Sequence, residues 1–116
     1  MAEDYLEQIR AIIRVCEDTD GILVVDRNGI IRDHRIAMNY YWKAEETVGR
    51  HILELYPELD GESSTILRVL RTGQAVYDQR QEIVNSRGER VVVDATTIPV
   101  LVNGRVEGAV DCARFY

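Results

Sequence analysis

Two Asn-Gly pairs constrain the fold of this chain more than any other feature of its sequence. Asn28-Gly29 lies between the runs GILVV and IIRDH, and Asn103-Gly104 lies between RVVVDATTIPVLV and RVEGAVDCARFY. An Asn-Gly pair between two such runs is the strongest short-range signal for a β-hairpin, because the turn needs positive φ angles. Each hairpin makes its two strands antiparallel neighbours, so the sequence predicts an antiparallel sheet.

The other segments predict helices before and between the strands. Residues 3–18 carry apolar side chains at spacings of three and four, which is typical of an amphipathic helix. A second helix is expected near residues 62–72, where Asp60 or Ser63 could cap the start and Gly73 ends it. Shorter helical patterns lie between the first hairpin and this helix.

The strands fall into two blocks with these helices between them. After the second helix, QAVYDQRQEIVN alternates between polar and apolar residues, SRGE turns, and the second Asn-Gly hairpin follows. This order predicts an α+β fold, in which a five-stranded antiparallel sheet carries helices on one face. The leading helix is then left to cover the opposite face of the sheet or a partner.

Length and charge exclude several classes of protein. A chain of 116 residues suits one domain, and 46% apolar with 29% charged residues is a soluble globular balance. A net charge of −6 disfavours direct nucleic-acid binding, which normally needs a basic face. No apolar stretch approaches the roughly 20 residues of a membrane span, and the acidic N-terminus resembles no signal peptide. We therefore expect a cytoplasmic protein without membrane or nucleic-acid partners.

The sequence contains no recognisable catalytic or metal-binding motif. Cys16 and Cys112 are far apart and form no CxxC, so both are expected to be reduced core thiols. There is no phosphate-binding glycine loop. His34 and His51 have no serine or cysteine at motif distance, and His51, at a helix boundary, is expected to be a capping or surface residue. We predict a protein that is not an enzyme and holds no metal.

Several segments, in this order and spacing, resemble a PAS domain. DGILVVDRNGIIR resembles the first hairpin of that family, and EETVGRH resembles its signature of an acidic pair, a β-branched residue, glycine and a basic residue. NSRGERVVV and VNGRVEGAVDCAR resemble its last turns and strands. The resemblance covers about residues 20–114. It divides the chain into an N-terminal dimerisation helix, residues 1–19, and a PAS domain, residues 20–116.

The resemblance is strongest to one subgroup, the N-terminal sensory PAS modules of sigma-54-dependent transcriptional activators. It rests on LELYPELDGESSTILRVLRTG and TTIPVLVNGRVEGAVDCAR. It implies a homodimeric sensory module of a bacterial-type regulator, linked to an output domain, that binds a small ligand such as an amino acid or small carboxylate. The alternatives are the PAS domain of a histidine kinase, a ligand-free dimerisation scaffold, and a small enzyme.

Known PAS cofactors are not expected. The flavin-binding branch resembles this chain less, because neither cysteine lies in an Asn-Cys-Arg motif. Haem-binding PAS domains usually supply a histidine from the long middle helix, and residues 62–72 contain none. We therefore predict no cofactor.

Candidate ligand-binding residues come from the segment behind the first hairpin and from the last two strands. Aromatic rings there could line a pocket, with hydroxyl and indole groups as polar contacts, or could simply fill the core. The candidates are Tyr40, Tyr41, Trp42, Thr96, Val110, Cys112 and Arg114.

Candidate dimer-interface residues come from the leading helix and from the last strand. They are Leu6, Ile9, Ile13, Cys16 and Asp111. Alternation along the last strand places Val110 and Cys112 on one face, which we expect to line the cavity. Asp111 is then expected to face the leading helix or a dimer partner.

Two aspartates, Asp94 and Asp111, lie within otherwise apolar runs of the last two strands. A buried charge needs a partner, and arginine could pair with one of them. Arg10 or Arg14 of the leading helix is the predicted partner of Asp111.

Overall fold

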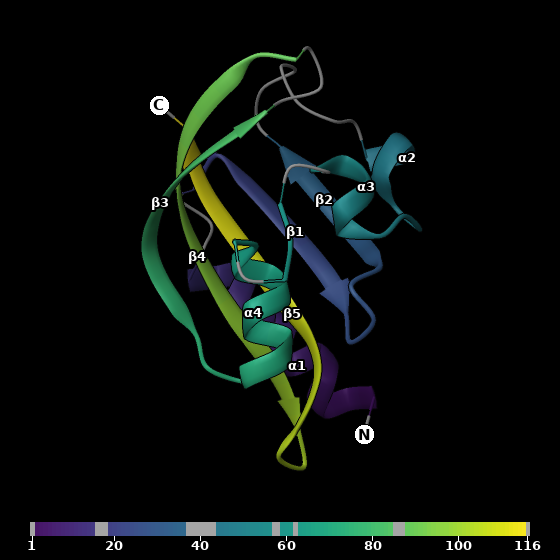
Figure 1. Ribbon diagram of the computed structural model, residues 1–116. Helices are drawn as coiled ribbons and strands as arrows, with labels where there is room; N and C mark the ends of the chain where they lie inside the picture. Colours follow the sequence, from purple (N-terminus) through teal and green to yellow (C-terminus); the bar gives the residue numbers. More distant parts are fainter. Residues whose placement is uncertain are drawn as a thin grey trace.

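The computed structural model describes residues 2–15, 19–36, 44–56, 59–61, 63–84 and 88–115. Five strands form one antiparallel sheet in the order β2-β1-β5-β4-β3, which confirms the predicted α+β class (Figure 1). The strands are β1 (Gly21–Asp26), β2 (Ile31–Ile36), β3 (Val76–Val84), β4 (Arg90–Val102) and β5 (Arg105–Phe115). The helices are α1 (Ala2–Val15), α2 (Ala44–Thr47), α3 (Ile52–Leu55) and α4 (Thr65–Thr72).

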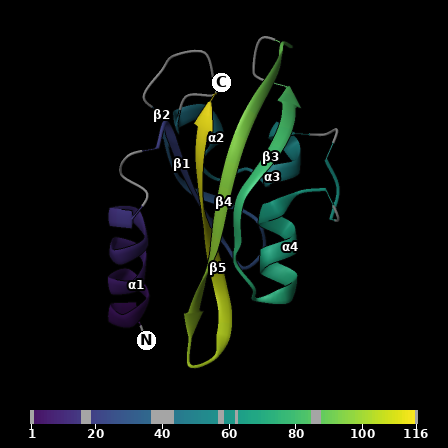
Figure 2. The same cartoon turned by 90° about the vertical axis from the view of Figure 1, so that its left-hand side faces the viewer.

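The sheet separates two layers of helices. Figure 2 shows α1 on one side of the sheet and α3 and α4 on the other. Each side has its own apolar core: Val25, Ile52 and Val69 are buried on the α3–α4 side, and Val24 and Val110 on the α1 side. Among the described residues, no helix has the length and apolar character to cross a membrane.

Helix α1 covers the sheet of its own chain. Ile12 is buried and Ile9 is half-buried against the core on that side. The side-chain amide of Gln8 donates from Nε2 to the carbonyl of Leu101 (2.6 Å), and its Oε1 accepts from the Leu101 backbone N–H (2.5 Å). The register between β4 and β5 shifts between Val100 and Leu101, so Gln8 bonds the backbone next to a β-bulge.

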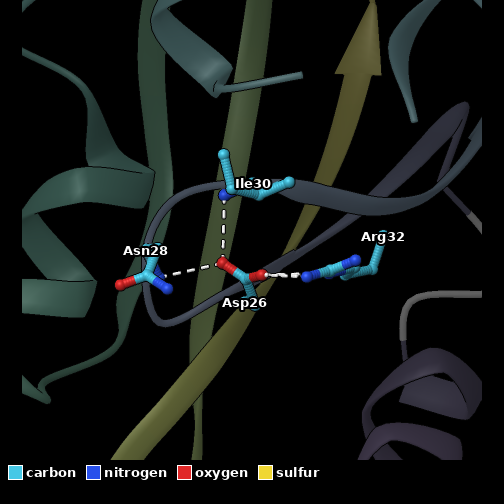
Figure 3. Close-up of polar contacts among 4 residues, drawn as sticks. All are labelled: Asp26, Asn28, Ile30 and Arg32. Atoms are coloured by element: carbon cyan, nitrogen blue, oxygen red, sulfur yellow. Dashed lines mark hydrogen bonds and ion pairs between the residues drawn. The ribbon is translucent and has the colours of Figure 1, made fainter. Parts of the chain in front are cut away.

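The carboxylate of Asp26 organises the turn of the first hairpin (Figure 3). Its Oδ1 accepts from the backbone N–H groups of Asn28 (2.9 Å) and Ile30 (3.1 Å), and its Oδ2 accepts from Nε of Arg32 (2.9 Å). Burial raises the pKa of Asp26, but the two backbone hydrogen bonds and Arg32 outweigh it and leave the pKa below its usual value. The ionised carboxylate therefore stabilises this turn.

The same turn positions α3 over the sheet. Gly29 has φ +79°, and a Cβ there would lie 2.7 Å from Nε2 of His51. The Gly29 carbonyl accepts from the N–H of Ile52 (2.9 Å) at the start of α3. His51 caps this helix: its Nδ1 accepts from Leu53 N–H (3.1 Å) and its own N–H donates to Glu54 Oε2 (2.9 Å). The expectation that His51 is a capping residue is confirmed.

Helix α4 is capped neither by Asp60 nor by Ser63, and it begins at Thr65. Ser64 is the N-cap, and its Oγ accepts from the N–H of Leu67 (3.2 Å). Asp60 and Ser63 bond each other instead: the Ser63 N–H donates to Asp60 Oδ1 (2.9 Å). The predicted end at Gly73 is confirmed, because Gly73 adopts φ +72° in the left-handed region.

Candidate ligand-binding cavity

A cavity of about 60 Å³ lies between the sheet and helices α3 and α4. That volume exceeds the space that a single water needs. Most of the lining is apolar, with a few polar groups among it, which is the usual composition of a small-molecule site. The described lining residues are Gly21, Ile22, Leu23, His34, Ile52, Tyr56, Leu59, Ser64, Thr65, Ile66, Gln81, Ile83, Val93, Ala95, Asp111 and Ala113.

One cross-strand row brings the polar groups of the sheet together. Leu23 of β1 pairs with His34 of β2 and with Asp111 of β5, and Asp111 pairs with Thr97 of β4. Residues opposite one another in a sheet lie on the same face. The side chains of His34, Asp111 and Thr97 therefore share the face that α3 and α4 cover.

Asp111 is held by a chain of hydroxyl groups. Thr97 Oγ1 lies 2.7 Å from Asp111 Oδ1 and 3.0 Å from Thr65 Oγ1 at the start of α4. A carboxylate only accepts and Thr97 has a single hydroxyl proton, so Thr97 donates to Asp111 and Thr65 donates to Thr97. Burial raises the pKa of Asp111 to about 6, although the Thr97 hydrogen bond acts in the opposite direction. The chain of bonds links β5 to β4 and α4.

His34 is a neutral imidazole at physiological pH. Its Nδ1 lies 3.0 Å from Thr47 Oγ1 of α2, and both residues are buried. Burial lowers the pKa of His34 to about 4, and the nearby carboxylate of Asp33 only partly opposes this. His34 therefore supplies the cavity wall with a polar ring that carries no charge.

The predicted orientation of the last strand is wrong. Val110 and Cys112 are buried in the core on the α1 side of the sheet, together with Ile12. Asp111 instead lines the cavity, on the opposite face from α1 and from the predicted arginine partners. The alternation itself is as expected, but it shows only which residues share a face. It does not show which helix covers that face.

Thr96 and Arg114, the other two ligand-binding candidates on the strands, also lie away from the cavity. Thr96 pairs with Cys112 in register, and its Oγ1 accepts from the backbone N–H of Asp78 (3.1 Å) rather than lining the cavity. Arg114 is exposed, two residues beyond Cys112 on β5. The expected arginine partner exists for the other aspartate: Nε of Arg80 lies 3.0 Å from Asp94 Oδ1.

The remaining candidates are placed only in part. Leu6 is 49% exposed, whereas Ile9 packs against the sheet of its own chain. Tyr40, Tyr41, Trp42, Cys16 and the side chain of Ile13 lie outside the described residues. Cys112 is disulfide-bonded, so the expectation of a reduced thiol is wrong for this residue. The homodimer stays a prediction.

Sequence reasoning missed His34, Thr97 and Thr65 as residues of the site. Thr97 and Thr65 are common residue types in unremarkable sequence contexts, and only the strand register and the packing of α4 bring them to Asp111. The signal that could have led to them is Asp111 itself, because a carboxyl in an apolar run requires a polar partner. Among the described residues, no group of three or more potential ligands could hold a metal ion.

The fold and the cavity define an α+β sheet domain that encloses a small site between its sheet and its helices. The chain belongs to the PAS family: the family model for the PAS fold matches residues 16–114. It is also similar to the transcriptional activator RocR of Bacillus subtilis (strain 168), with 21% identity over 96 residues. These residues are 81% of this chain but 21% of RocR, so the chain spans about a fifth of that relative.

Solved structures share the fold at low sequence identity. The PAS domain of a protein from Colwellia psychrerythraea matches with a TM-score of 0.70 and 17% identity, over 93% of this chain and 96% of that one. The PAS domain of nitrogen regulation protein NR(II) from Vibrio parahaemolyticus matches with a TM-score of 0.62 and 19% identity, over 89% and 95%. The PAS fold predicted from the sequence is thus confirmed, and the similarity to RocR agrees with the predicted likeness to activator modules.

Proposed function

We propose that this chain is the sensory PAS module of a bacterial-type signalling or transcription regulator, and that it binds a small molecule in the cavity beside Asp111. The observation that carries this proposal is the cavity itself, because its apolar wall contains a carboxyl group with one hydroxyl partner among the described residues. Asp111 is half-buried, and removing a carboxyl from water without full hydrogen bonding costs stability. A binding role gives a reason for that cost.

The position of Asp111 suggests how binding would reach an output domain. Asp111 lies on β5, the last strand, and its hydroxyl chain runs through Thr97 of β4 to Thr65 of α4. A ligand that engages Asp111 changes the balance of these bonds, and with it the fit of α4 against the sheet. The role of RocR as a transcriptional activator supports the proposal that the signal ends in gene regulation.

A cavity-filling variant tests the binding role. Ala95 is buried and lines the cavity, so Ala95→Leu should occupy the space that a ligand needs. A small-metabolite library is screened by thermal shift, since a compound that binds only the native state raises Tm. Compounds that stabilise the wild type should lose their effect on Ala95→Leu. They should keep it on Ala11→Leu, which adds the same group at an exposed position of α1.

Stabilisation that survives in Ala95→Leu would exclude the cavity as the binding site. A library without any stabilising compound would favour the alternative of a ligand-free dimerisation scaffold. The sequence downstream of this domain distinguishes an activator from a histidine kinase.

We also propose that the module forms a homodimer through α1. Leu6 on this helix is 49% exposed, although neighbouring apolar side chains of the helix pack on the sheet. Light scattering should show a dimer that Leu6→Gln weakens, while Arg10→Gln at an exposed position of the same helix leaves it unchanged. An equal mass for the wild type and Leu6→Gln would contradict this use of α1.

A further inference from the structure

The charge inside the cavity indicates which chemistry it can accept. Asp111 is the only described lining residue whose side chain is charged near neutral pH, and none of these residues is lysine or arginine. The described arginines are exposed, except Arg68, which is half-buried and donates to Gln79 Oε1 (2.7 Å). An anion in this cavity would meet a carboxylate with no described cation to offset it, whereas a cation would be attracted.

The hydrogen-bonding capacity of the site points the same way. A carboxylate can accept about four hydrogen bonds, and Thr97 is the one described side chain that donates to Asp111. The single proton of Thr97 is used in that bond. Among the described residues, the remaining lone pairs of Asp111 are therefore open to a hydrogen-bond donor on a ligand.

The rest of the wall sets the character of the ligand body. Ile52, Ile66 and Val93 line the cavity together with other aliphatic side chains. These groups favour a short hydrocarbon, because apolar burial is worth about 25 cal/mol per Å² and they offer no hydrogen bonds. A ligand that fits has one donating group at one end and a small aliphatic body.

We propose, building on the binding role above, that the cavity selects a small organic cation of the primary-amine class, whose ammonium group donates to the Asp111 carboxylate. The aliphatic body of the amine packs beneath α3 and α4. This choice differs from the amino acid or small carboxylate that the family resemblance implies, since a ligand carboxylate would meet Asp111 without a described cation. Thr97 acts as a positioning residue that fixes one oxygen of Asp111 and leaves the other for the ligand.

Three matched probes test this proposal: n-butylamine, n-butanol and butyrate, each titrated into the full chain at pH 8 and followed by NMR chemical shifts. The amine should bind about 10-fold or more tightly than the alcohol, because both can donate to Asp111 but only the ammonium adds the attraction between opposite charges. Butyrate should bind most weakly. Asp111→Asn keeps the shape of the side chain and should remove the preference for the amine.

Asp94→Asn is the matched control, because it removes a carboxylate from the same sheet at a position that pairs with Arg80 and does not line the cavity. This variant should keep the preference for n-butylamine. The proposal is overturned if butyrate or n-butanol binds as well as the amine, if Asp111→Asn binds the amine as tightly as the wild type does, or if n-butylamine causes no shifts at millimolar concentrations.

Acidification gives an independent readout. Asp111, His34 and Tyr56 are the described titratable residues of the lining. Between pH 8 and pH 5 the carboxyl of Asp111, with its pKa raised to about 6, becomes protonated, while His34, with its pKa lowered to about 4, stays neutral. Amine affinity should fall about 10-fold at pH 5 in the wild type, since each pKa unit is a factor of ten in protonation. An affinity equal at both pH values would contradict the pairing with Asp111.

These outcomes separate the ligand class from the sensory role. If n-butanol or butyrate binds in the wild type and loses binding in Ala95→Leu, the cavity is a binding site but the amine class is wrong. If n-butylamine binds equally to the wild type and to Ala95→Leu, the cavity is not the site, and both proposals fail.

Discussion

Replacing Asp111 by asparagine should make the protein more stable at alkaline pH. Burial raises the pKa of Asp111 from 3.8 to about 6, so ionising this carboxyl in the folded protein costs roughly 3 kcal/mol at 1.36 kcal/mol per pKa unit. The asparagine side chain would carry no charge, and its carbonyl can still accept from Thr97. Its NH2 group would need hydrogen-bond acceptors, and the described contacts of Asp111 supply none, which costs about 1 kcal/mol or more. We therefore expect Asp111→Asn to raise the free energy of unfolding by about 1–2 kcal/mol at pH 8.

The sign of the pH dependence follows from proton binding. Between pH 3.8 and about 6 the folded protein holds a proton on Asp111 that the unfolded chain has released, so this group makes stability fall as pH rises through that window. His34 acts oppositely: its pKa falls from 6.5 to about 4, so its contribution to stability is lost as pH falls through that range. The two effects partly cancel in the wild type. The difference between the wild type and Asp111→Asn isolates the aspartate.

Urea unfolding at pH 8 and pH 4.5 measures this difference. The stabilisation by Asp111→Asn should be present at pH 8 and largely lost at pH 4.5, where the wild-type carboxyl is mostly protonated. Asp94→Asn, which breaks an ion pair between Asp94 and Arg80, should give no such gain. A destabilisation by Asp111→Asn that is the same at both pH values would refute the reasoning, because it would mean that ionising this half-buried carboxyl carries no cost in the folded protein.

Three further variants test the local structure, each by urea unfolding. Gly29→Ala should lower the free energy of unfolding by about 2 kcal/mol, because its φ of +79° disfavours alanine and the new Cβ would contact His51. Gly104→Ala is the control: it has the same φ but open space around the new Cβ, so it should cost less. Asp26→Asn should cost about 1–2 kcal/mol at neutral pH. Since the pKa of Asp26 is lowered in the folded protein, its contribution is complete above 3.8 and is lost as pH falls through the folded pKa, so the cost should shrink in acid. Gln8→Ala should cost about 1–2 kcal/mol by removing both bonds to Leu101, and an equal stability would show that α1 does not depend on them.

The features that the sequence predicted correctly depend on neighbouring residues. Gly29 and Gly104 adopt the positive φ angles that their turns need, and Gly73 does the same at the end of α4. Each of these positions is determined within four residues, so local composition is enough to identify it. Ser64 shows the limit of such reasoning, because Asp60, Ser63 and Ser64 are all good caps and only the geometry of the turn chooses among them.

The face of β5 could not be determined locally. Val110 and Cys112 on one side, and Ala109 and Ala113 on the other, are all compatible with a buried surface. Both sides of this sheet are covered by helices, so hydrophobicity gives no preference for either assignment. The choice depends on whether the larger or the smaller side chains face α1, and that is a property of the packing between distant parts of the chain.

The register of β4 and β5 adds a second non-local step, and it connects α1 to the cavity. Counted evenly from the Asn103-Gly104 turn, Asp111 would lie opposite Thr96. Because of the bulge, Glu107 has no paired residue on β4, although Val106 and Gly108 on either side of it do. Asp111 therefore lies opposite Thr97, and the Thr97 hydroxyl donates to its carboxylate on the cavity side.

Gln8 bonds both backbone groups of Leu101 beside this bulge, from the other face of the sheet. Helix α1 therefore contacts β4 next to the bulge that sets the register between Thr97 and Asp111. Because the same contact joins the helix to the strand pair that ends the domain, a change in how α1 packs and a change in the cavity act on one structural element.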